Sequence, residues 1–277
     1  MAEETQYTAK TKMATLTTSS SSLTGSGSTL IISGGTNGTL VKKVYFKAQN
    51  STTSPSGLIR LFIFNGSSYF LIKEINMPPV TQSSSSPPPI MQSFETWIDL
   101  NLTLSPSSSI YASYQSGSSP SINVIAEGMD WSYYNNGVRA DTTQYTFSTN
   151  SVDAKTANPD LNGSTTNPLF TAYTAGSAAT YKGSSIQSIR IKSSVGTSPG
   201  MVRIWIQDLS SNNFLLTEIP VPIVQLNSDY GVDRSFQYEI IFNNYFNLQA
   251  GYSILASTQN TQDFNVIVEG KDWNYAS

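Results

Sequence analysis

The strongest constraint on the fold is a stretch of ten residues that occurs twice. Residues 122–131 read Ile-Asn-Val-Ile-Ala-Glu-Gly-Met-Asp-Trp, and residues 264–273 read Phe-Asn-Val-Ile-Val-Glu-Gly-Lys-Asp-Trp. About half of the chain separates the two copies. A second stretch, Gly-Leu-Ile-Arg-Leu-Phe-Ile at 57–63, likewise returns as Gly-Met-Val-Arg-Ile-Trp-Ile at 200–206. Self-similarity at a fixed spacing indicates a tandem duplication, so two similar folded units are expected.

The pattern inside each unit predicts antiparallel β-strands. Short runs of β-branched and aromatic residues are separated by Pro, Gly and Asn, and no window has apolar residues at the helical period. Asn65-Gly66 joins two such runs, residues 60–64 and 69–75, as a β-hairpin. We therefore predict an all-β chain of two tandem antiparallel β-sandwich or jelly-roll domains that arose by internal duplication.

The duplication and the composition together suggest domain boundaries. Residues 1–38 are rich in Ser, Thr and Gly and are expected to form a flexible N-terminal arm, with one short strand at 30–32. The arm is either unattached or ordered only against neighbouring subunits. Residues 39–134 are assigned to the first sandwich and 182–277 to the second. Residues 135–181 are expected to hold a linker and the first strand of the second unit, at 144–148.

Composition excludes several classes of function. Charged residues make up 12% of the chain, about half of the usual ~25%, and no basic run exists, which disfavours nucleic-acid binding. The chain has no Cys and no His, so a Ser-His-Asp triad within one chain is ruled out. No apolar run reaches the ~20 residues of a membrane span. The first five residues lack the features of a signal peptide. We expect no enzymatic activity and no cofactor.

Two carboxylate pairs recur in the duplicated stretch and are candidates for chemistry. They are Glu127 with Asp130, and Glu269 with Asp272. Such a pair can act as acid and base in glycoside hydrolysis or hold a metal ion, but positions i and i+3 of a strand face opposite sides. A structural role is favoured, in which Gly128 and Gly270 permit a bulge or turn beside the acids.

Tryptophan and arginine residues also hold equivalent positions in the two repeats. Trp131 and Trp273 could stack on sugar rings, but their place after an apolar strand favours closing a core or an interface. Arg60 and Arg203 are expected to pair with Glu74 and Glu218 across a hairpin, as routine cross-strand charges.

One further stretch, Asp160-Leu161-Asn162-Gly163, has the beginning of a calcium loop. Thr171 stands where that loop needs a glutamate, so a plain turn is favoured there.

The repeated stretches resemble a family of proteins. Arg-Leu-Phe-Ile-Phe-Asn-Gly at 60–66, Leu-Ile-Lys-Glu-Ile at 71–75, Ile-Tyr-Ala-Ser-Tyr-Gln at 110–115 and Asn-Val-Ile-Ala-Glu-Gly at 123–128 resemble a β-sandwich module of bacteriophage and prophage virion structural proteins. The resemblance covers both repeats and leaves the arm and linker unmatched. The tandem pair also resembles double jelly-roll major capsid proteins. It departs from them in the small size of each repeat and in the absence of helical signals.

Two functions of different classes follow as expectations. The first is a structural subunit of a phage particle (capsid, head decoration, neck or tail), made in the host cytoplasm and released by lysis. It would assemble with copies of itself, as a trimer or a larger assembly, and with other virion proteins. The second is a β-sandwich module that binds carbohydrate or another receptor. Exposed aromatic side chains in a groove would favour the second function, and large self-complementary interfaces the first.

Overall fold

The computed structural model describes residues 5–49, 53–54, 56–81, 93–116, 121–133, 143–160, 169–177, 181–193, 196–224 and 236–275, and no helix occurs among them. This confirms the predicted all-β class. The strands are β1 (Thr5–Leu16), β2 (Thr29–Ser33), β3 (Thr39–Ala48), β4 (Thr53–Ser54), β5 (Gly57–Phe64), β6 (Tyr69–Met77), β7 (Val80–Thr81), β8 (Glu95–Leu104), β9 (Ser109–Ser116), β10 (Ile122–Tyr133), β11 (Thr143–Ala154), β12 (Phe170–Thr174), β13 (Gly183–Ser193), β14 (Gly200–Gln207), β15 (Asn213–Val221), β16 (Gln237–Leu248), β17 (Ser253–Thr258) and β18 (Phe264–Tyr275).

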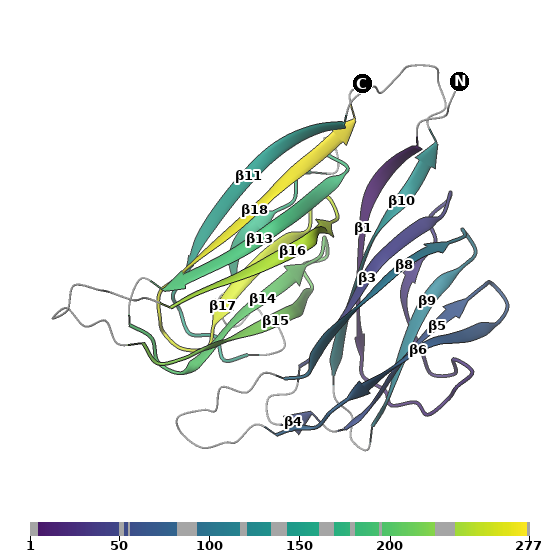
Figure 1. Ribbon diagram of the computed structural model, residues 1–277, viewed down its shortest axis with the longest axis horizontal. Coiled ribbons are helices and arrows are strands. Elements are labelled where there is room, and N and C mark those ends of the chain that lie inside the picture. Colours follow the sequence, from purple (N-terminus) through teal and green to yellow (C-terminus); the bar gives the residue numbers. More distant parts are fainter. Residues whose placement is uncertain are drawn as a thin grey trace.

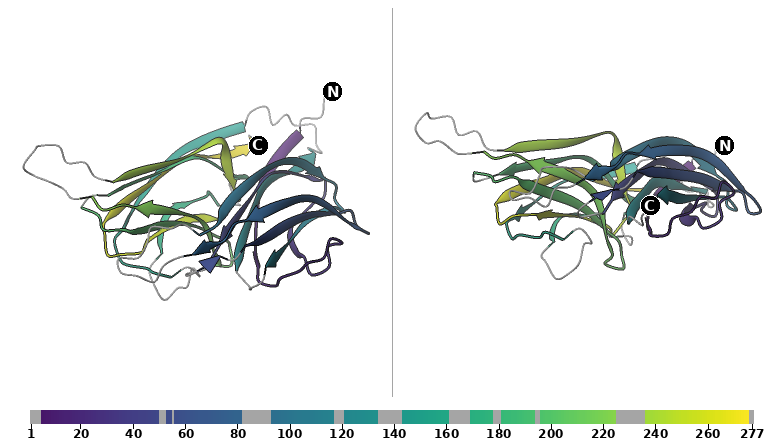
Figure 2. Two further views of the ribbon diagram at one scale, coloured as in Figure 1. Left: turned by 60° about the horizontal axis from the view of Figure 1, so that its bottom comes forward. Right: turned by 90° about the horizontal axis from the view of Figure 1, so that it is seen from below.

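The strands form two jelly-roll sandwiches that lie side by side (Figures 1 and 2). In the first, the sheet β1-β10-β3-β8 faces the sheet β2-β9-β5-β6; in the second, β11-β18-β13-β16 faces β12-β17-β14-β15. All pairs in these sheets are antiparallel. The strand order of one half repeats in the other, as tandem duplication would produce. The sandwich prediction is therefore confirmed.

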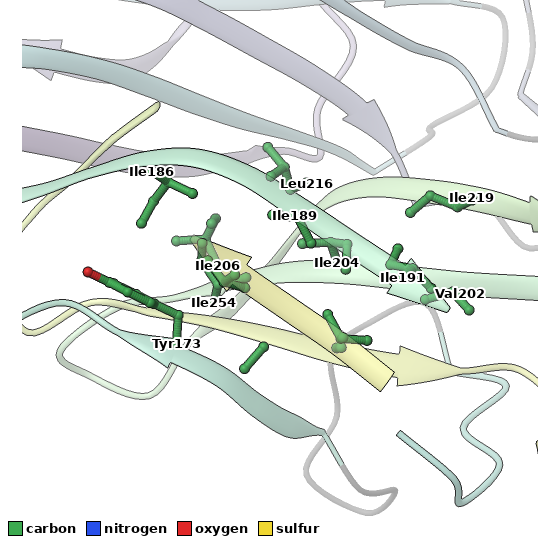
Figure 3. Packing of buried hydrophobic residues seen from close by; sticks show 14 of the residues in the cluster. Tyr173, Ile186, Ile189, Ile191, Val202, Ile204, Ile206, Leu216, Ile219 and Ile254 are labelled. Atoms are coloured by element: carbon green, nitrogen blue, oxygen red, sulfur yellow. The ribbon is translucent and has the colours of Figure 1, made fainter. Parts of the chain in front are cut away.

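Alternation along the strands fills each sandwich. In the first, Val44 and Phe46 on β3 and Val124 and Ala126 on β10 point between the sheets and are buried. In the second, Ile189 and Ile191 on β13 face Val202 and Ile204 on β14 (Figure 3). Each half thus has its own apolar core.

The ends of the two sandwiches differ from the expected boundaries. The span assigned to a flexible arm holds β1 and β2. β1 pairs with β10 along its whole length, from Thr5 opposite Tyr133 to Leu16 opposite Ile122. The span assigned mainly to a linker holds β11 and β12, and β11 pairs with β18 in the same way. These polar segments are held in place by backbone pairing with a strand that is distant in the sequence. Their local composition therefore does not reveal that they form strands.

The hairpin predicted around Asn65-Gly66 is present, with Gly66 at a φ of +99°. Its strands β5 and β6 carry a register shift next to Leu71, at the bulged residue Ile72. The equivalent pair β14 and β15 has the same shift at Leu216. Bulges at equivalent positions show that the two repeats share detailed geometry as well as strand order.

Candidate functional site: the face-to-edge interface and its groove

The outer face of the sheet β1-β10-β3-β8 covers one edge of the second sandwich, along β15 and the C-terminal end of β16, where Asn247 is buried. We call this contact the face-to-edge interface. Ile125 of β10 points away from its own sandwich and is buried in the core of the second one, together with the half-buried Met13 and Tyr45. The ring of Tyr45 meets that of Phe246 edge-on, with centroids 5.6 Å apart. The first sandwich thereby closes the open end of the second core.

A carboxyl group is buried in this interface. Glu127 follows Ile125 on the same face of β10, and its Oε2 accepts a hydrogen bond of 2.6 Å from the backbone N–H of Asn247. Beside it, Thr11 donates to the carbonyl of Asn247 at 2.9 Å and accepts from the N–H of Gln249 at 3.0 Å. Burial raises the pKa of Glu127 to about 7, against the opposing effect of the Asn247 hydrogen bond and of Lys42 and Lys43.

A network of buried charges crosses the same interface. Lys47 of β3 lies 3.2 Å from Glu218 of β15 and 3.0 Å from Glu95 of β8. Glu218 also accepts a hydrogen bond from Arg203 Nε at 3.0 Å and one from the hydroxyl of Ser93 at 2.8 Å. These bonds satisfy the carboxylate on both oxygens, which a buried charge requires.

The network keeps Glu218 ionised. Its burial alone would raise the pKa, but the nearby Lys47 and Arg203 charges, with hydrogen bonds from Ser93 and Arg203, outweigh that effect and lower it. Buried ion pairs contribute little net stability compared with apolar packing, but losing one partner is costly. The network therefore fixes how the two sandwiches dock more than it adds to their affinity.

A groove of about 450 Å³ opens beside the network. Trp97 and Asp99 of β8 line one wall, and Tyr238 and Glu239 of β16 belong to the other. Trp97 and Tyr238 are largely exposed. Lys43 Nζ lies 3.4 Å from Asp99 Oδ1 in the groove wall. Exposed rings next to acids and amides form the kind of surface that stacks on and hydrogen-bonds to a polar ligand.

The structure separates the two carboxylates of each repeated motif. Glu127 lies in the face-to-edge interface, whereas Asp130 binds Lys10 Nζ at 2.9 Å and the hydroxyl of Thr39. In the second repeat, Glu269 accepts a hydrogen bond from Ser188 at 2.9 Å. Asp272 accepts one from the hydroxyl of Tyr173 at 2.8 Å and one from Ser184. The two members of each pair therefore share no hydrogen-bond partner among the described residues.

The glycines of the motif lie where the backbones of two strands come close. A Cβ on Gly128 would lie 2.4 Å from the carbonyl oxygen of Leu40, and one on Gly270 would lie 2.9 Å from that of Ser185. The pairing register shifts beside both glycines, because the facing strand has one extra residue there. This residue is Lys42 opposite Gly128 and Gln187 opposite Gly270. Each glycine thus makes room for a bulge in its neighbour.

The two tryptophans occupy unequal environments. Trp273 is only 5% exposed, and a Cβ on Gly183 would lie 2.9 Å from its ring. Trp131 is half-buried and meets Tyr7 edge-on, with centroids 6.4 Å apart. Neither lines the groove.

The two arginines also differ in their surroundings. Arg60 Nε lies 2.9 Å from Glu74 Oε1 and Arg203 Nε lies 3.0 Å from Glu218 Oε1, as the hairpin registers dictate. The Arg60 pair faces solvent on the Glu74 side, whereas the Arg203 pair is fully enclosed.

Metal-ligand clusters and membrane-spanning helices were sought in the described parts of the chain. They contain no cluster of three or more His, Cys, Asp or Glu side chains that could hold an ion. Asp160 is described, but residues 161–168 of the considered calcium loop lie outside the described residues. Nor do the described residues include a helix long and apolar enough to cross a membrane.

Sequence reasoning missed the interface residues Lys47, Glu95, Thr11 and Asn247. Their side chains look like ordinary surface groups until the two repeats are docked. One signal was present: Ile125 lies on the face that Asn123 and Glu127 share, so an apolar residue interrupts a polar face.

Comparison with known proteins gives distant structural matches and no sequence match. No family model matches the chain, and no curated protein matches it in sequence. The PBSX exported protein XepA aligns with a TM-score of 0.26 and 11% identity over 96% of this chain and 86% of that one. The STIV MCP gives 0.25 and 10%, over 96% of each chain. The major capsid protein P2 from Bacteriophage PM2 gives 0.21 and 11%, over 96% and 98%. These scores are too low to establish a relationship, and the fold is defined by the strand order of the four sheets.

Proposed function

We propose that this chain is a structural subunit of a virus particle, a phage component of the capsid, head-decoration, neck or tail type, that acts by self-assembly. The observation that carries the proposal is where its exposed apolar side chains gather. On edge strands β6, β8 and β16 they are Phe70, Leu71, Ile72, Trp97, Tyr238, Ile241 and Tyr245. Edge strands that expose large apolar groups are suited to contact with another chain.

Two further observations support assembly over catalysis. Only 12% of the residues are charged, so little electrostatic repulsion keeps copies apart. The carboxylates of the repeated motif are engaged in hydrogen bonds or ion pairs, Glu127 between the two sandwiches and the other three within their own, which suits a structural part. Copies of the chain and other proteins of the particle are the partners that this function implies, and lysis of the host is the route of release.

Electron microscopy of the purified protein tests the proposal. A self-assembling subunit gives discrete rings, shells or filaments as the protein is concentrated, because the exposed edges find partners by mass action. A field of single two-lobed particles at every concentration would contradict the proposal.

The groove supports a second candidate, a module that binds carbohydrate. Trp97 and Tyr238 present exposed rings, and Asp99, Glu239 and Asn243 bring polar groups to the same groove. Sugar rings stack on aromatic faces while their hydroxyls bond to such groups. Titration of the intrinsic tryptophan fluorescence with glycans tests it. Binding that Trp97→Ala abolishes without lowering the melting temperature supports this candidate, and an unchanged spectrum with every glycan rejects it.

A further inference from the structure

The two sandwiches share their strand order, yet only one of two equivalent edges is covered. β15 and the end of β16 at Asn247 lie under the first sandwich, whereas their counterparts, β6 and the end of β8 at Thr103, are exposed. Leu216 is 7% exposed and its counterpart Ile72 is 36% exposed. The side chain of Glu218 is 1% exposed and that of Glu74 is 43% exposed. The first sandwich thus has an edge equivalent to the covered one, and no described part of the chain covers it.

The covering half of the interface is also duplicated and also uncovered. On the outer face of the sheet β11-β18-β13-β16, Ile267 stands at the position of Ile125, and Lys192 stands at that of Lys47. Ile267 is half-exposed and Lys192 is exposed, although their counterparts are buried. The second sandwich therefore presents a face equivalent to the one that the first uses within the chain.

The charges that lock the internal interface recur on these two free surfaces. Within the chain, Lys47 forms an ion pair with Glu218, and Glu218 also pairs with Arg203 of the neighbouring strand. On the free surfaces, Lys192 replaces Lys47, while Glu74 is already held by Arg60 at 2.9 Å. The two surfaces thus carry opposite charges at matching positions, as the internal interface does.

We propose that copies of this chain associate head to tail, so that the β11-β18-β13-β16 face of one copy covers the β6–β8 edge of the next. Lys192 pairs with Glu74 of the next copy, and Ile267 packs near its Ile72. This proposal rests on the self-assembly proposed above and specifies which two surfaces meet. It is heterologous, so it builds rings or filaments according to the rotation between copies.

The contact between copies is weaker than the internal one. Arg190 replaces Tyr45 on the second face, where it pairs with Glu239 at 2.7 Å and with Glu269 at 2.9 Å. Ser151 replaces Met13. Less apolar area is therefore removed from water, and association depends on the protein concentration.

Cysteine cross-linking tests the contact, because the chain has no cysteine of its own. Thr217 Oγ1 lies 3.0 Å from Glu95 Oε2 across the internal interface. The equivalent positions on the free surfaces are Lys73 and Gln237, both exposed. The variant with Lys73→Cys and Gln237→Cys keeps Lys192 and Glu74. With a short bis-maleimide it gives a ladder of covalent multimers in denaturing gels.

Three matched variants make the result decisive. Thr217→Cys with Glu95→Cys is the internal control and gives a cross-linked monomer, which shows that the reagent spans this distance. Leu209→Cys with Gln237→Cys gives no ladder, because exposed Leu209 lies in the β14–β15 turn. Adding Lys192→Glu to the Lys73–Gln237 variant abolishes the ladder, because it places two carboxylates opposite each other.

The outcomes separate this contact from self-assembly in general. If the internal control cross-links and the Lys73–Gln237 variant gives no ladder while the protein sediments as oligomers, self-assembly holds but uses another surface. A ladder that survives Lys192→Glu would also overturn the proposed contact. If the protein sediments as a monomer at every concentration and gives no ladder, the contact and the proposed self-assembly both fail.

Discussion

Glu127 should make the protein less stable as the pH rises from 5 to 8. In the folded chain its pKa is raised by burial to about 7, compared with 4.5 for a free side chain. Between these values the folded state binds a proton that the unfolded state has released. The free energy of unfolding therefore falls as the pH rises through this window and levels off above pH 7.

The size of the effect follows from the shift in pKa. A shift of about 2.5 corresponds to a total of about 3 kcal/mol at ~1.4 kcal/mol per unit, of which about 2–3 kcal/mol is lost between pH 5 and pH 8. The lowered pKa of Glu218 acts in the opposite direction, but its contribution is lost only below the unfolded value near 4.5. Above pH 5 the contribution of Glu218 is therefore constant.

Urea unfolding at pH 5 and at pH 8 measures this difference directly. Glu127→Gln keeps the acceptor for the Asn247 N–H and removes the titration, so its stability should differ little between the two pH values. Glu269→Gln is the control: its carboxylate is partly exposed and ion-paired with Arg190, so the variant should keep the full pH dependence. A wild-type stability that is flat or rising from pH 5 to pH 8 would refute the burial argument.

Three further predictions concern the repeated residues. Trp273→Ala should cost about 3–5 kcal/mol because the ring is buried, and Trp131→Ala should cost less, as thermal melts of both variants would show; equal losses would contradict the unequal burial. Glu218→Ala should lower the free energy of unfolding by about 3–5 kcal/mol, because it leaves buried cations unpaired. Its exposed counterpart, Glu74→Ala, should lower it by at most about 1 kcal/mol in the same denaturation assay, and similar losses would refute the enclosed network. Gly128→Ala should destabilise the β10–β3 ladder, because its Cβ would meet a backbone carbonyl 2.4 Å away, and hydrogen exchange along β3 should rise; unchanged protection would argue against the close approach.

Local sequence signals predicted the parts of the fold that local physics determines. Alternating apolar residues, turn glycines and the Asn65-Gly66 hairpin locate β5, β6 and most other strands to within a few residues. The duplicated stretch predicted two similar sandwiches, and their strand orders agree with it. The strands β1 and β11 were not predicted in full. They are held as strands by backbone pairing with β10 and β18, which lie more than a hundred residues away in the sequence.

The candidate site shows the opposite balance. The repeat identified Glu127, Gly128 and Arg203 as positions of interest, but their surroundings depend on how the two sandwiches dock. Nothing local distinguishes Glu218, enclosed by Lys47 and Arg203, from its counterpart Glu74 on an open edge. The difference arises because a face covers one edge and leaves the other free, which is a property of tertiary structure.

Sedimentation velocity of the full chain across a wide concentration range, beside the Lys192→Glu variant, tests most directly whether the chain assembles through repeated face-to-edge contacts. We expect the wild-type protein to shift from monomer to larger species as the concentration rises. Lys192→Glu should stay monomeric over the same range with an unchanged melting temperature. A wild-type protein that sediments as a monomer at every concentration would contradict assembly through face-to-edge contacts. So would a variant that assembles as readily as the wild type.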